Sequence, residues 1–233
     1  MKSIKRTTRF AGSLYLLIAI FGGFAFFAGY ESLMVTADAG ATTKHVLAAE
    51  MMFRVGVLGD SFTFLGEIIL TILLYEIFKP VSKSLSQIAA FSRLAMTAMI
   101  GMNVLNKLLV LQLLSGADYL SVFQPEQLQA LAMLFLKAYG YGSLIWGLFF
   151  SLHLVIIGYL IIKSGYVPKV LGLLFIFASF GYMINSFGLF ILPQYEAIYQ
   201  IIVLATIPAE LAFAFFLLIK GISVEKYSKK YVD

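Results

Sequence analysis

Six long apolar runs constrain the fold of this chain more than any other feature of its sequence. Each run is long enough for a helix to cross the ~30 Å hydrocarbon core of a membrane, which takes about 20 residues. The runs are continuously apolar and do not alternate with a period of two, so helices are favoured over a membrane β-barrel. We therefore predict an all-α fold, a polytopic bundle of six transmembrane helices. The expected spans lie in a single membrane domain over residues 1–233, at approximately 10–30, 51–78, 88–114, 130–162, 170–192 and 197–219.

The composition agrees with a chain that uses lipid as part of its solvent. It is 61% hydrophobic and only 12% charged, about half the charged fraction of an average soluble domain. The chain has no cysteine, which excludes disulfides, thiolate catalysis and cysteine metal sites. The net charge of +5 collects in short segments between the apolar runs, a pattern of membrane topology. The expected partners are the lipid bilayer and a small-molecule or lipid ligand, with no nucleic acid; the sequence does not predict an oligomeric state.

The charged residues also predict the orientation of the chain. One set of loops and ends carries Lys2, Lys5, Arg6, Arg9, Lys79, Lys83, Lys163, Lys169, Lys220, Lys226, Lys229 and Lys230. The other set carries Glu31, Asp38, Lys44, Glu50, Asp118, Glu126 and Glu196, with Lys44 as its basic exception. Lys and Arg favour the cytoplasmic side, so we expect the N- and C-termini to be cytoplasmic. The first apolar run lacks a clear small-residue cleavage site, and we interpret it as a retained helix.

Three ionisable residues, Glu67, His153 and Glu210, lie near the middle of three different runs. With a rise of ~1.5 Å per residue, Glu67 lies about 18 Å from Lys79, and His153 and Glu210 each lie about 15 Å from the lysine that follows their runs. All three therefore fall close to the midplane of a ~30 Å core. Ionisable groups at this depth are costly and face a protein interior, so they form the leading candidate for a functional site.

Further polar residues extend this candidate site. Asp60 and Glu67 share a stripe with Thr63 and Thr71, all within roughly 80° around one helix. We expect Arg54 to pair with Glu50 near the outer interface, and Arg93 to extend its side chain to the cytoplasmic surface. The pattern predicts an outward-opening polar cavity with Arg54, Lys107 and Lys137 near its mouth. The predicted ligand- or proton-binding residues are Asp60, Glu67, His153, Glu210, Asn103, Lys107, Asn185, Arg54 and Lys137.

Several interpretations of the midplane residues stay open. They form a structural network of satisfied polar groups, a proton or ion pathway, or a divalent metal site, although no recognised metal motif is present. A Ser–His–acid triad fails because Ser151 points away from His153 on the same helix. The leading hypothesis is small-ligand or ion binding or transport. The alternatives are a membrane-embedded enzyme acting on a lipid or isoprenoid, with or without a metal, and a non-catalytic accessory subunit; no catalytic residue, metal ligand or cofactor is identified.

Pro208 lies inside the sixth expected helix, two residues before Glu210. A proline at this place frees a backbone carbonyl and can kink the helix. Two interpretations are open: a proline that the membrane helix tolerates, or a kink that aims the side chain of Glu210.

Four segments resemble a known family: RFAGSLYLLI (9–18), LKAYGYG (136–142), FFSLHLVIIGYLIIKSGYVPKVLG (149–172) and PAELAFAFFLLIKGI (208–222). They are similar to a bacterial membrane family that is catalogued as a domain of unknown function, number four-three-eight-six. The block at 149–172 is the most specific, a histidine-bearing helix followed by a basic Ser-Gly-Tyr-x-Pro turn. The resemblance covers nearly the whole chain and implies a six-helix protein of the bacterial cytoplasmic (plasma) membrane. It implies no activity, and it transfers no site residues.

Overall fold

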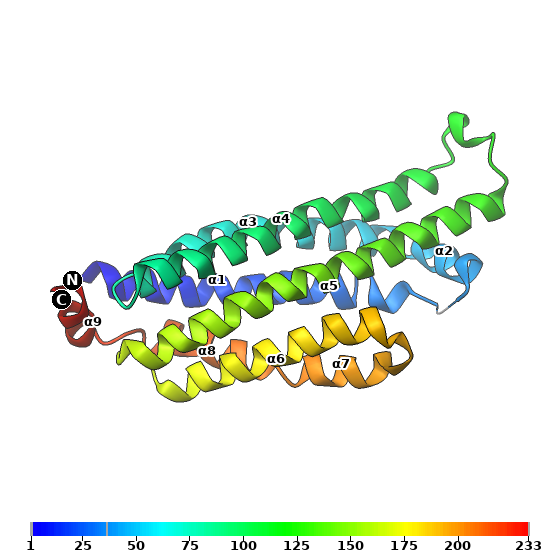
Figure 1. The fold of residues 1–233 in the computed structure, drawn as a ribbon. Coiled ribbons are helices and arrows are strands. Elements are labelled where there is room, and N and C mark those ends of the chain that lie inside the picture. The colour runs from blue at the N-terminus through cyan, green and yellow to red at the C-terminus, as the bar shows by residue number, and fades with distance from the viewer. Residues whose placement is uncertain (1, 36, 233) are drawn as a thin grey trace. The chain divides into compact units, whose positions relative to one another are not determined.

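The computed structural model describes residues 2–35 and 37–232, and these residues form helices and turns without strands. The helices are α1 (Lys2–Phe27), α2 (Ala39–Ala48), α3 (Glu50–Phe78), α4 (Lys83–Leu113), α5 (Pro125–Ser164), α6 (Lys169–Ile191), α7 (Glu196–Leu204), α8 (Ile207–Ile219) and α9 (Val224–Val232) (Figure 1). Short 3-10 turns, η1 (Glu31–Leu33), η2 (Asp118–Leu120) and η3 (Pro193–Tyr195), connect some of them. The prediction of an all-α chain is therefore confirmed for the described residues.

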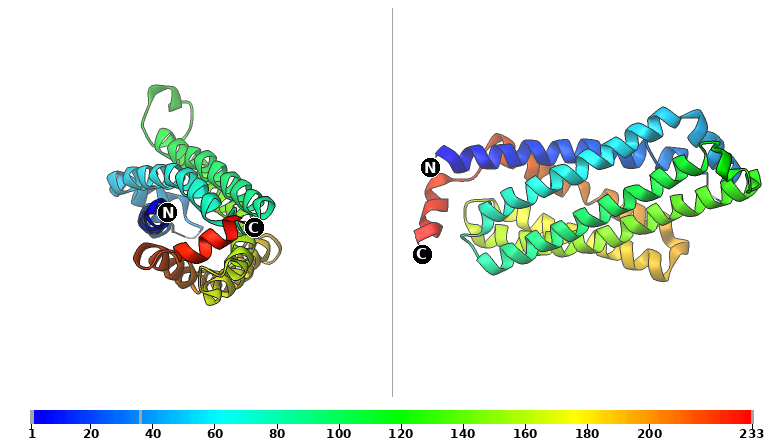
Figure 2. Two further views of the ribbon diagram at one scale, coloured as in Figure 1. Left: turned by 90° about the vertical axis from the view of Figure 1, so that its left-hand side faces the viewer. Right: turned by 90° about the horizontal axis from the view of Figure 1, so that it is seen from above.

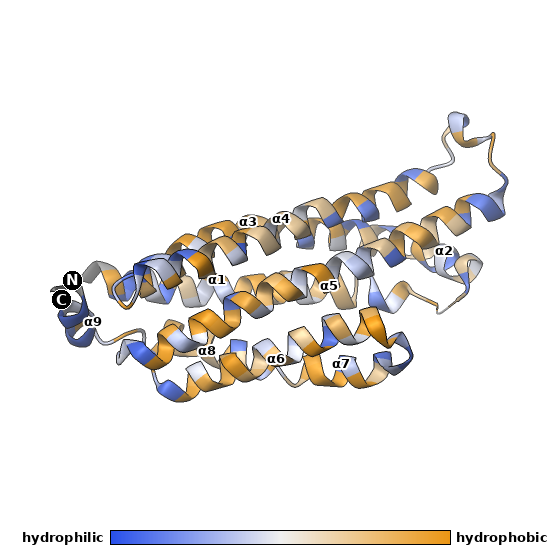
Figure 3. Cartoon of the chain, viewed as in Figure 1, coloured by the Kyte–Doolittle hydropathy of each residue, from blue (hydrophilic) through white to orange (hydrophobic). Residues whose placement is uncertain are grey.

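Six segments of this part of the chain are long and apolar enough to cross a membrane, as predicted. They are Ile4–Leu33, Glu50–Phe78, Lys83–Leu113, Pro125–Ser164, Lys169–Ile191 and Pro193–Ile219. Several begin earlier than expected because the helix continues into polar residues beyond the apolar run. Helix α5, for example, begins at Pro125, where a proline costs nothing because the first helical N–H has no partner. Hydrophobic residues dominate α6–α8, whereas α9 is hydrophilic (Figure 3). The chain is a multi-pass membrane protein.

The contacts divide the chain into two compact units. Unit 1 comprises Met1–Leu17, Gly66–Thr97 and Leu144–Asp233, and unit 2 comprises Ile18–Leu65 and Ala98–Ser143. Helices α1, α3, α4 and α5 each contribute one part of their length to each unit. The expectation of a single membrane domain stays a prediction.

Small residues let the helices of unit 1 pack closely. A Cβ atom at Gly158 of α5 would lie 2.7 Å from the carbonyl oxygen of Gly172 on α6, so these two backbones meet directly. Helix α6 also packs against α7 and α8 (Figure 1). Phe213 of α8 contacts Phe175 and Phe78, with ring centroids 4.9 Å and 6.5 Å away. Helix α9 lies where α1 begins (Figure 2), and there the Tyr227 hydroxyl donates to the carbonyl of Glu76 at 3.0 Å.

The sixth predicted span is two helices. Helix α7 ends at Leu204 and α8 begins at Ile207, with Ala205 and Thr206 between them. Pro208 lies in the first turn of α8. An N–H group at this position has no acceptor within the helix, so a proline, which lacks the N–H, costs no hydrogen bond there. Whether this proline is only tolerated or aims the side chain of Glu210 stays a prediction. The break places Glu210 in the first turn of α8, where the helix dipole favours an acidic side chain.

Unit 2 has its own hydrophobic core and a close contact between two backbone segments. Asp38 caps α2 by accepting a hydrogen bond from the backbone N–H of Ala41 at 2.8 Å, the usual role of Asp at this position. A Cβ atom at Gly29 would lie 2.7 Å from the Cα of Gly56, so the chain after α1 touches α3. The buried core of this unit comprises Tyr30, Leu33, Val46, Phe53, Val110, Ala132, Leu136 and Tyr139.

Candidate functional site

Arg93 of α4 is the centre of a buried polar network in unit 1. Its side chain is 1% exposed. The Nε atom donates to Oε2 of Glu67 on α3 at 2.6 Å, and Nη1 donates to Nε2 of His153 on α5 at 2.9 Å. Removing a single charge from water is costly unless it is paired and hydrogen-bonded. The contact with Glu67 therefore explains how both charged groups are tolerated at this depth.

Both ring nitrogens of His153 have partners, and the partners define its protonation. A guanidinium group only donates, so Nε2 of His153 must accept the hydrogen bond from Arg93. Nδ1 lies 2.9 Å from the carbonyl oxygen of Ala89, which only accepts, so Nδ1 carries the proton. His153 is thus a neutral imidazole in one tautomer. It orients the guanidinium of Arg93 and has no ring nitrogen left for another ligand.

Glu210 joins the same network through tyrosine hydroxyls. Its Oε1 accepts from the Tyr182 hydroxyl at 2.8 Å, and its Oε2 accepts from the Tyr15 hydroxyl at 3.3 Å. The Cζ of Arg93 lies 5.1 Å from the centre of the Tyr15 ring and 5.7 Å from that of Phe150, within the range of cation–π attraction. The three midplane residues predicted from the sequence therefore meet in one network.

The charges of this network do not balance when both carboxylates are ionised. Arg93 supplies one positive charge, Glu67 and Glu210 supply two negative charges, and His153 is neutral. The cation lies in direct contact with Glu67, whereas Glu210 accepts its hydrogen bonds from the neutral hydroxyls of Tyr15 and Tyr182. A proton on Glu210 would make the network neutral. The arrangement can therefore take up and release a proton without breaking its ion pair.

Unit 2 contains a second buried cluster. Lys107 of α4 donates from Nζ to Oδ2 of Asp60 at 2.8 Å and to the carbonyl of Ala25 at 3.0 Å. The Tyr139 hydroxyl donates to Asp60 at 3.3 Å, and the ammonium lies 4.2 Å from the centre of the Tyr139 ring. Asn103 donates from Nδ2 to the carbonyl of Tyr139 at 2.8 Å. One cation and one carboxylate make this cluster neutral.

Several predicted site residues lie elsewhere. Lys107 was expected near the mouth of a cavity, but its side chain is 0% exposed because it pairs with Asp60. Arg54 forms the predicted pair with Glu50 at 2.7 Å, in an exposed position. Lys137 is exposed and Asn185 of α6 is half-buried. Among residues 2–35 and 37–232, no hydrogen bond links either of them to the clusters.

The polar stripe of α3 is buried, and its residues are divided between the two clusters. Asp60 and Thr63 belong to unit 2, and Glu67 and Thr71 belong to unit 1. The two threonine hydroxyls donate to carbonyls of their own helix, at Gly59 and Glu67. The threonine hydroxyls therefore form their hydrogen bonds within α3, whereas the carboxylates of Asp60 and Glu67 accept hydrogen bonds from side chains of α4.

Arg93 was predicted wrongly, and two tyrosines were missed. We expected Arg93 to reach the surface, but Glu67 and His153 hold it in the interior. A signal was present in the sequence: Arg93 lies ten residues after Lys83, about 15 Å at the helical rise, which is the depth of the midplane residues. Tyr15 and Tyr182 carry no comparable signal, because tyrosine is common in apolar cores and at membrane interfaces.

A metal centre was one of the open interpretations of the midplane residues. In the described part of the chain, no group of three or more His, Cys, Asp or Glu side chains is placed to hold a metal ion. His153 has one carboxylate nearby through Arg93, and both of its nitrogens already have partners.

Comparison with known proteins identifies the family. An uncharacterized protein of Archaeoglobus fulgidus is 42% identical over 74 residues, which make up 32% of this chain and 43% of that protein. The chain thus aligns with less than half of this archaeal relative. No solved structure matches the chain. The model of a family described as "Domain of unknown function (DUF4386)" matches residues 10–221. The resemblance predicted from the sequence is confirmed, and the chain belongs to the DUF4386 family.

Proposed function

We propose that this protein binds or transports a small ligand or ion across the membrane, and that the Arg93 network of unit 1 is its protonatable centre. Glu210 is the group that exchanges the proton in this proposal. The observation that carries it is a difference between two carboxylates: Glu67 contacts the Arg93 guanidinium at 2.6 Å, whereas Glu210 accepts hydrogen bonds from the hydroxyls of Tyr15 and Tyr182.

The neighbouring groups favour Glu210 over the other two candidates. Protonating Glu67 would leave the buried charge of Arg93 without its direct counter-charge, which is strongly unfavourable. Protonating His153 at Nε2 would place a second cation against Arg93 and abolish the hydrogen bond between them. Protonating Glu210 requires neither change, because tyrosine hydroxyls can donate or accept. Carboxylates in such positions are the usual proton carriers of membrane pumps and transporters.

The broken sixth span supports a binding role for the same place. Glu210 lies in the first turn of α8, directly after the interruption at Ala205 and Thr206. Interrupted membrane helices recur at transporter binding sites, because their ends supply backbone groups and a helix dipole to the ligand. The proposal thus joins a proton-exchanging side chain with a helix start that favours an anion.

The remaining predicted residues have secondary parts in the proposal. Asp60, Asn103 and Lys107 form the buried polar cluster of unit 2, which we propose as a separate ligand-binding centre of that unit. Arg54, Lys137 and Asn185 are proposed as further polar residues that contact the ligand. The outward-opening cavity itself stays a prediction.

We also propose that both termini lie in the cytoplasm, in a bacterial plasma membrane. Lys79 and Lys83 flank the α3–α4 connection, whereas Asp118 and Glu126 lie around the α4–α5 connection. The absence of native cysteine allows a direct test with single cysteines at Lys83 and at Asp118. A membrane-impermeant maleimide added to intact cells should label Asp118→Cys and spare Lys83→Cys. The reverse pattern would contradict this orientation.

Difference infrared spectroscopy of the purified protein in lipid tests the protonatable centre. We expect a pH-dependent carboxylic-acid C=O band that disappears in Glu210→Gln. The matched control is Glu196→Gln, because Glu196 lies in the first turn of α7 but is exposed. The control should keep the band. A band that persists in Glu210→Gln would overturn the assignment of the proton to this residue.

A second measurement addresses transport. Proteoliposomes that contain a trapped pH indicator receive a potassium diffusion potential through valinomycin, and proton entry is followed directly. Wild type and Glu196→Gln should admit protons faster than Glu210→Gln does. Equal rates in all three proteins would contradict proton movement through this network.

A further inference from the structure

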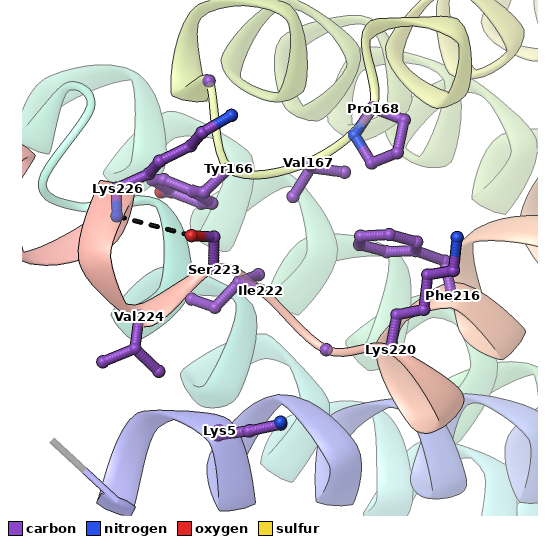
Figure 4. Close-up of a pocket in the computed structure, with 12 residues that line it drawn as sticks. Lys5, Tyr166, Val167, Pro168, Phe216, Lys220, Ile222, Ser223, Val224 and Lys226 are labelled. Atoms are coloured by element: carbon purple, nitrogen blue, oxygen red, sulfur yellow. Dashed lines mark hydrogen bonds between the residues drawn. The ribbon is translucent and has the colours of Figure 1, made fainter.

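A basic pocket lies in unit 1, formed by residues that the proposed function does not use. It has a volume of about 520 Å³ and is lined by Lys5, Gly165, Tyr166, Val167, Pro168, Phe216, Lys220, Gly221, Ile222, Ser223, Val224 and Lys226. These residues come from α1, the α5–α6 connection, the end of α8, the α8–α9 connection and the start of α9 (Figure 4). All belong to unit 1.

The rim and the floor of the pocket differ in character. Three exposed lysines form the rim of the pocket: Lys5 of α1, Lys220 directly after α8, and Lys226 of α9 (Figure 4). The lining includes no acidic residue. Tyr166, Val167 and Ile222 are buried beneath the rim, at 4%, 3% and 3% exposure. A rim of ammonium groups over an apolar floor suits a ligand that carries both an anionic group and a hydrocarbon part.

Hydrogen bonds and close contacts fix the segments that line the pocket. The Tyr166 hydroxyl donates to the carbonyl of Ile77 at 2.6 Å, and its ring contacts that of Tyr227 at 5.5 Å. Burial raises the pKa of Tyr166 above its ordinary value, so this hydroxyl remains a neutral donor. Gly221 has a φ of +65°, and a Cβ atom there would lie 3.1 Å from Oγ1 of Thr8. Helix α1 and the α8–α9 connection are thus held against each other.

We propose that this pocket binds a phosphate group, as carried by an anionic phospholipid headgroup. The lysines that form it belong to the set of basic loops and ends, and basic pockets at the ends of membrane helices bind anionic headgroups. The apolar floor would receive the first carbons next to the phosphate. Free inorganic phosphate shares the same charge and hydrogen-bond acceptors, and the experiment separates these two sources.

Binding is measured by native mass spectrometry of the protein in detergent. The probes are short-chain phosphatidylglycerol, phosphatidylcholine and inorganic phosphate, each added separately. The test variant is Lys5→Gln/Lys220→Gln/Lys226→Gln. The matched control, Lys44→Gln/Lys83→Gln/Lys229→Gln, removes the same charge from three exposed lysines outside the pocket. Circular dichroism compares the helix content of both triple variants with that of the wild type.

The wild type and the control should bind phosphatidylglycerol more tightly than phosphatidylcholine, and the test variant should lose this preference. Each lysine should raise the affinity for phosphatidylglycerol about fivefold. Lys220→Gln alone should therefore show a partial loss of this affinity even if the triple variant misfolds. Inorganic phosphate that binds to the wild type and competes with the lipid would assign the pocket to free phosphate. Equal weakening in the test and control variants, or none in either, would overturn the proposal.

Discussion

The two buried ion pairs differ in how their cations are used. Arg93 in unit 1 divides its donors between Glu67 and His153, and its planar group lies near the rings of Tyr15 and Phe150. Lys107 in unit 2 is a compact charge that donates to Asp60 and to the carbonyl of Ala25. Both pairs satisfy a charge that lipid or protein interior would otherwise penalise.

The difference that matters for function is the second carboxylate. The buried cluster of unit 2 has one cation and one carboxylate, so any change of protonation breaks its charge balance. The Arg93 network of unit 1 includes Glu210 in addition to the Glu67–Arg93 pair, and one added proton makes its net charge zero. The Lys107–Asp60 cluster should therefore keep a fixed charge state, whereas the Arg93 network can change its charge state during a functional cycle. Four predictions test this contrast.

The largest expected effect comes from removing either cation. Lys107→Met should lower the free energy of unfolding by about 3–5 kcal/mol, because it leaves a buried carboxylate without its partner. Arg93→Met should cost at least as much, because Glu67 and His153 both lose a donor. Equilibrium unfolding in detergent micelles, followed by circular dichroism, measures both. Lys137→Met is the exposed control and should stay within about 0.5 kcal/mol of wild type. A small loss in Lys107→Met would contradict the contact with Asp60.

Replacing both partners of each pair tests the contacts around that pair. Asp60→Leu/Lys107→Met should recover only part of the stability lost in the single variant, because the Tyr139 hydroxyl and the Ala25 carbonyl lose their partners. Glu67→Leu/Arg93→Met should likewise remain about 1–3 kcal/mol below wild type, because Nε2 of His153 is left without its donor. The same unfolding assay applies. Full recovery in the second double variant would show that His153 does not depend on Arg93.

Much of the fold and part of the site could be predicted from the sequence, for physical reasons. The six spans follow from run length alone, because a bilayer sets how many apolar residues a helix needs. The common depth of Glu67, His153 and Glu210 follows from the helical rise. The partners could not be predicted in this way, since they depend on which helix faces which. The predicted positions of the Arg93 and Lys107 side chains were therefore wrong, although the depth of both residues along their helix could be estimated from the sequence.

The break in the sixth span illustrates a second limit. Pro208 indicated that the helix could change direction, but hydropathy is continuous from 197 to 219 and gives no boundary. The structure ends α7 at Leu204 and starts α8 at Ile207. Thr206, fully buried between them, donates from its hydroxyl to the carbonyl of Val203 at 2.7 Å. Such local satisfaction of a freed backbone group depends on side-chain geometry that a hydropathy pattern does not encode.

Tyrosine-to-phenylalanine changes probe the hydroxyl donors of the two carboxylates. Tyr182→Phe removes a 2.8 Å hydrogen bond to Glu210, and we expect a loss of about 1.5–3 kcal/mol if Glu210 is ionised at the pH of the assay. Tyr139→Phe removes 3.3 Å contacts to Asp60, and its cost should be nearer 0.5–1.5 kcal/mol because Lys107 still pairs with Asp60. The unfolding assay is run at several pH values. A greater cost for Tyr139→Phe would reverse the proposed dependence on hydroxyl donors.

The smallest expected effect is also the sharpest test of the contrast. Glu210→Gln imitates a protonated carboxyl group: its Oε1 can accept from Tyr182, and its amide can donate to the Tyr15 oxygen. Stability should therefore change by less than about 1 kcal/mol. The same chemical change in unit 2, Asp60→Asn, removes the only carboxylate that contacts Lys107 among the described residues. That variant should lose about 3 kcal/mol or more.

Measuring these two variants side by side in the unfolding assay isolates charge from shape, because each replaces one carboxylate with the amide of the same size. A near-neutral Glu210→Gln beside a costly Asp60→Asn is the result that our comparison requires. Similar losses in both would mean that Glu210 needs its negative charge to stabilise the fold. Its extra carboxylate would then be part of the architecture of unit 1, as Asp60 is in unit 2, and the case for proton exchange at α8 would fail with it.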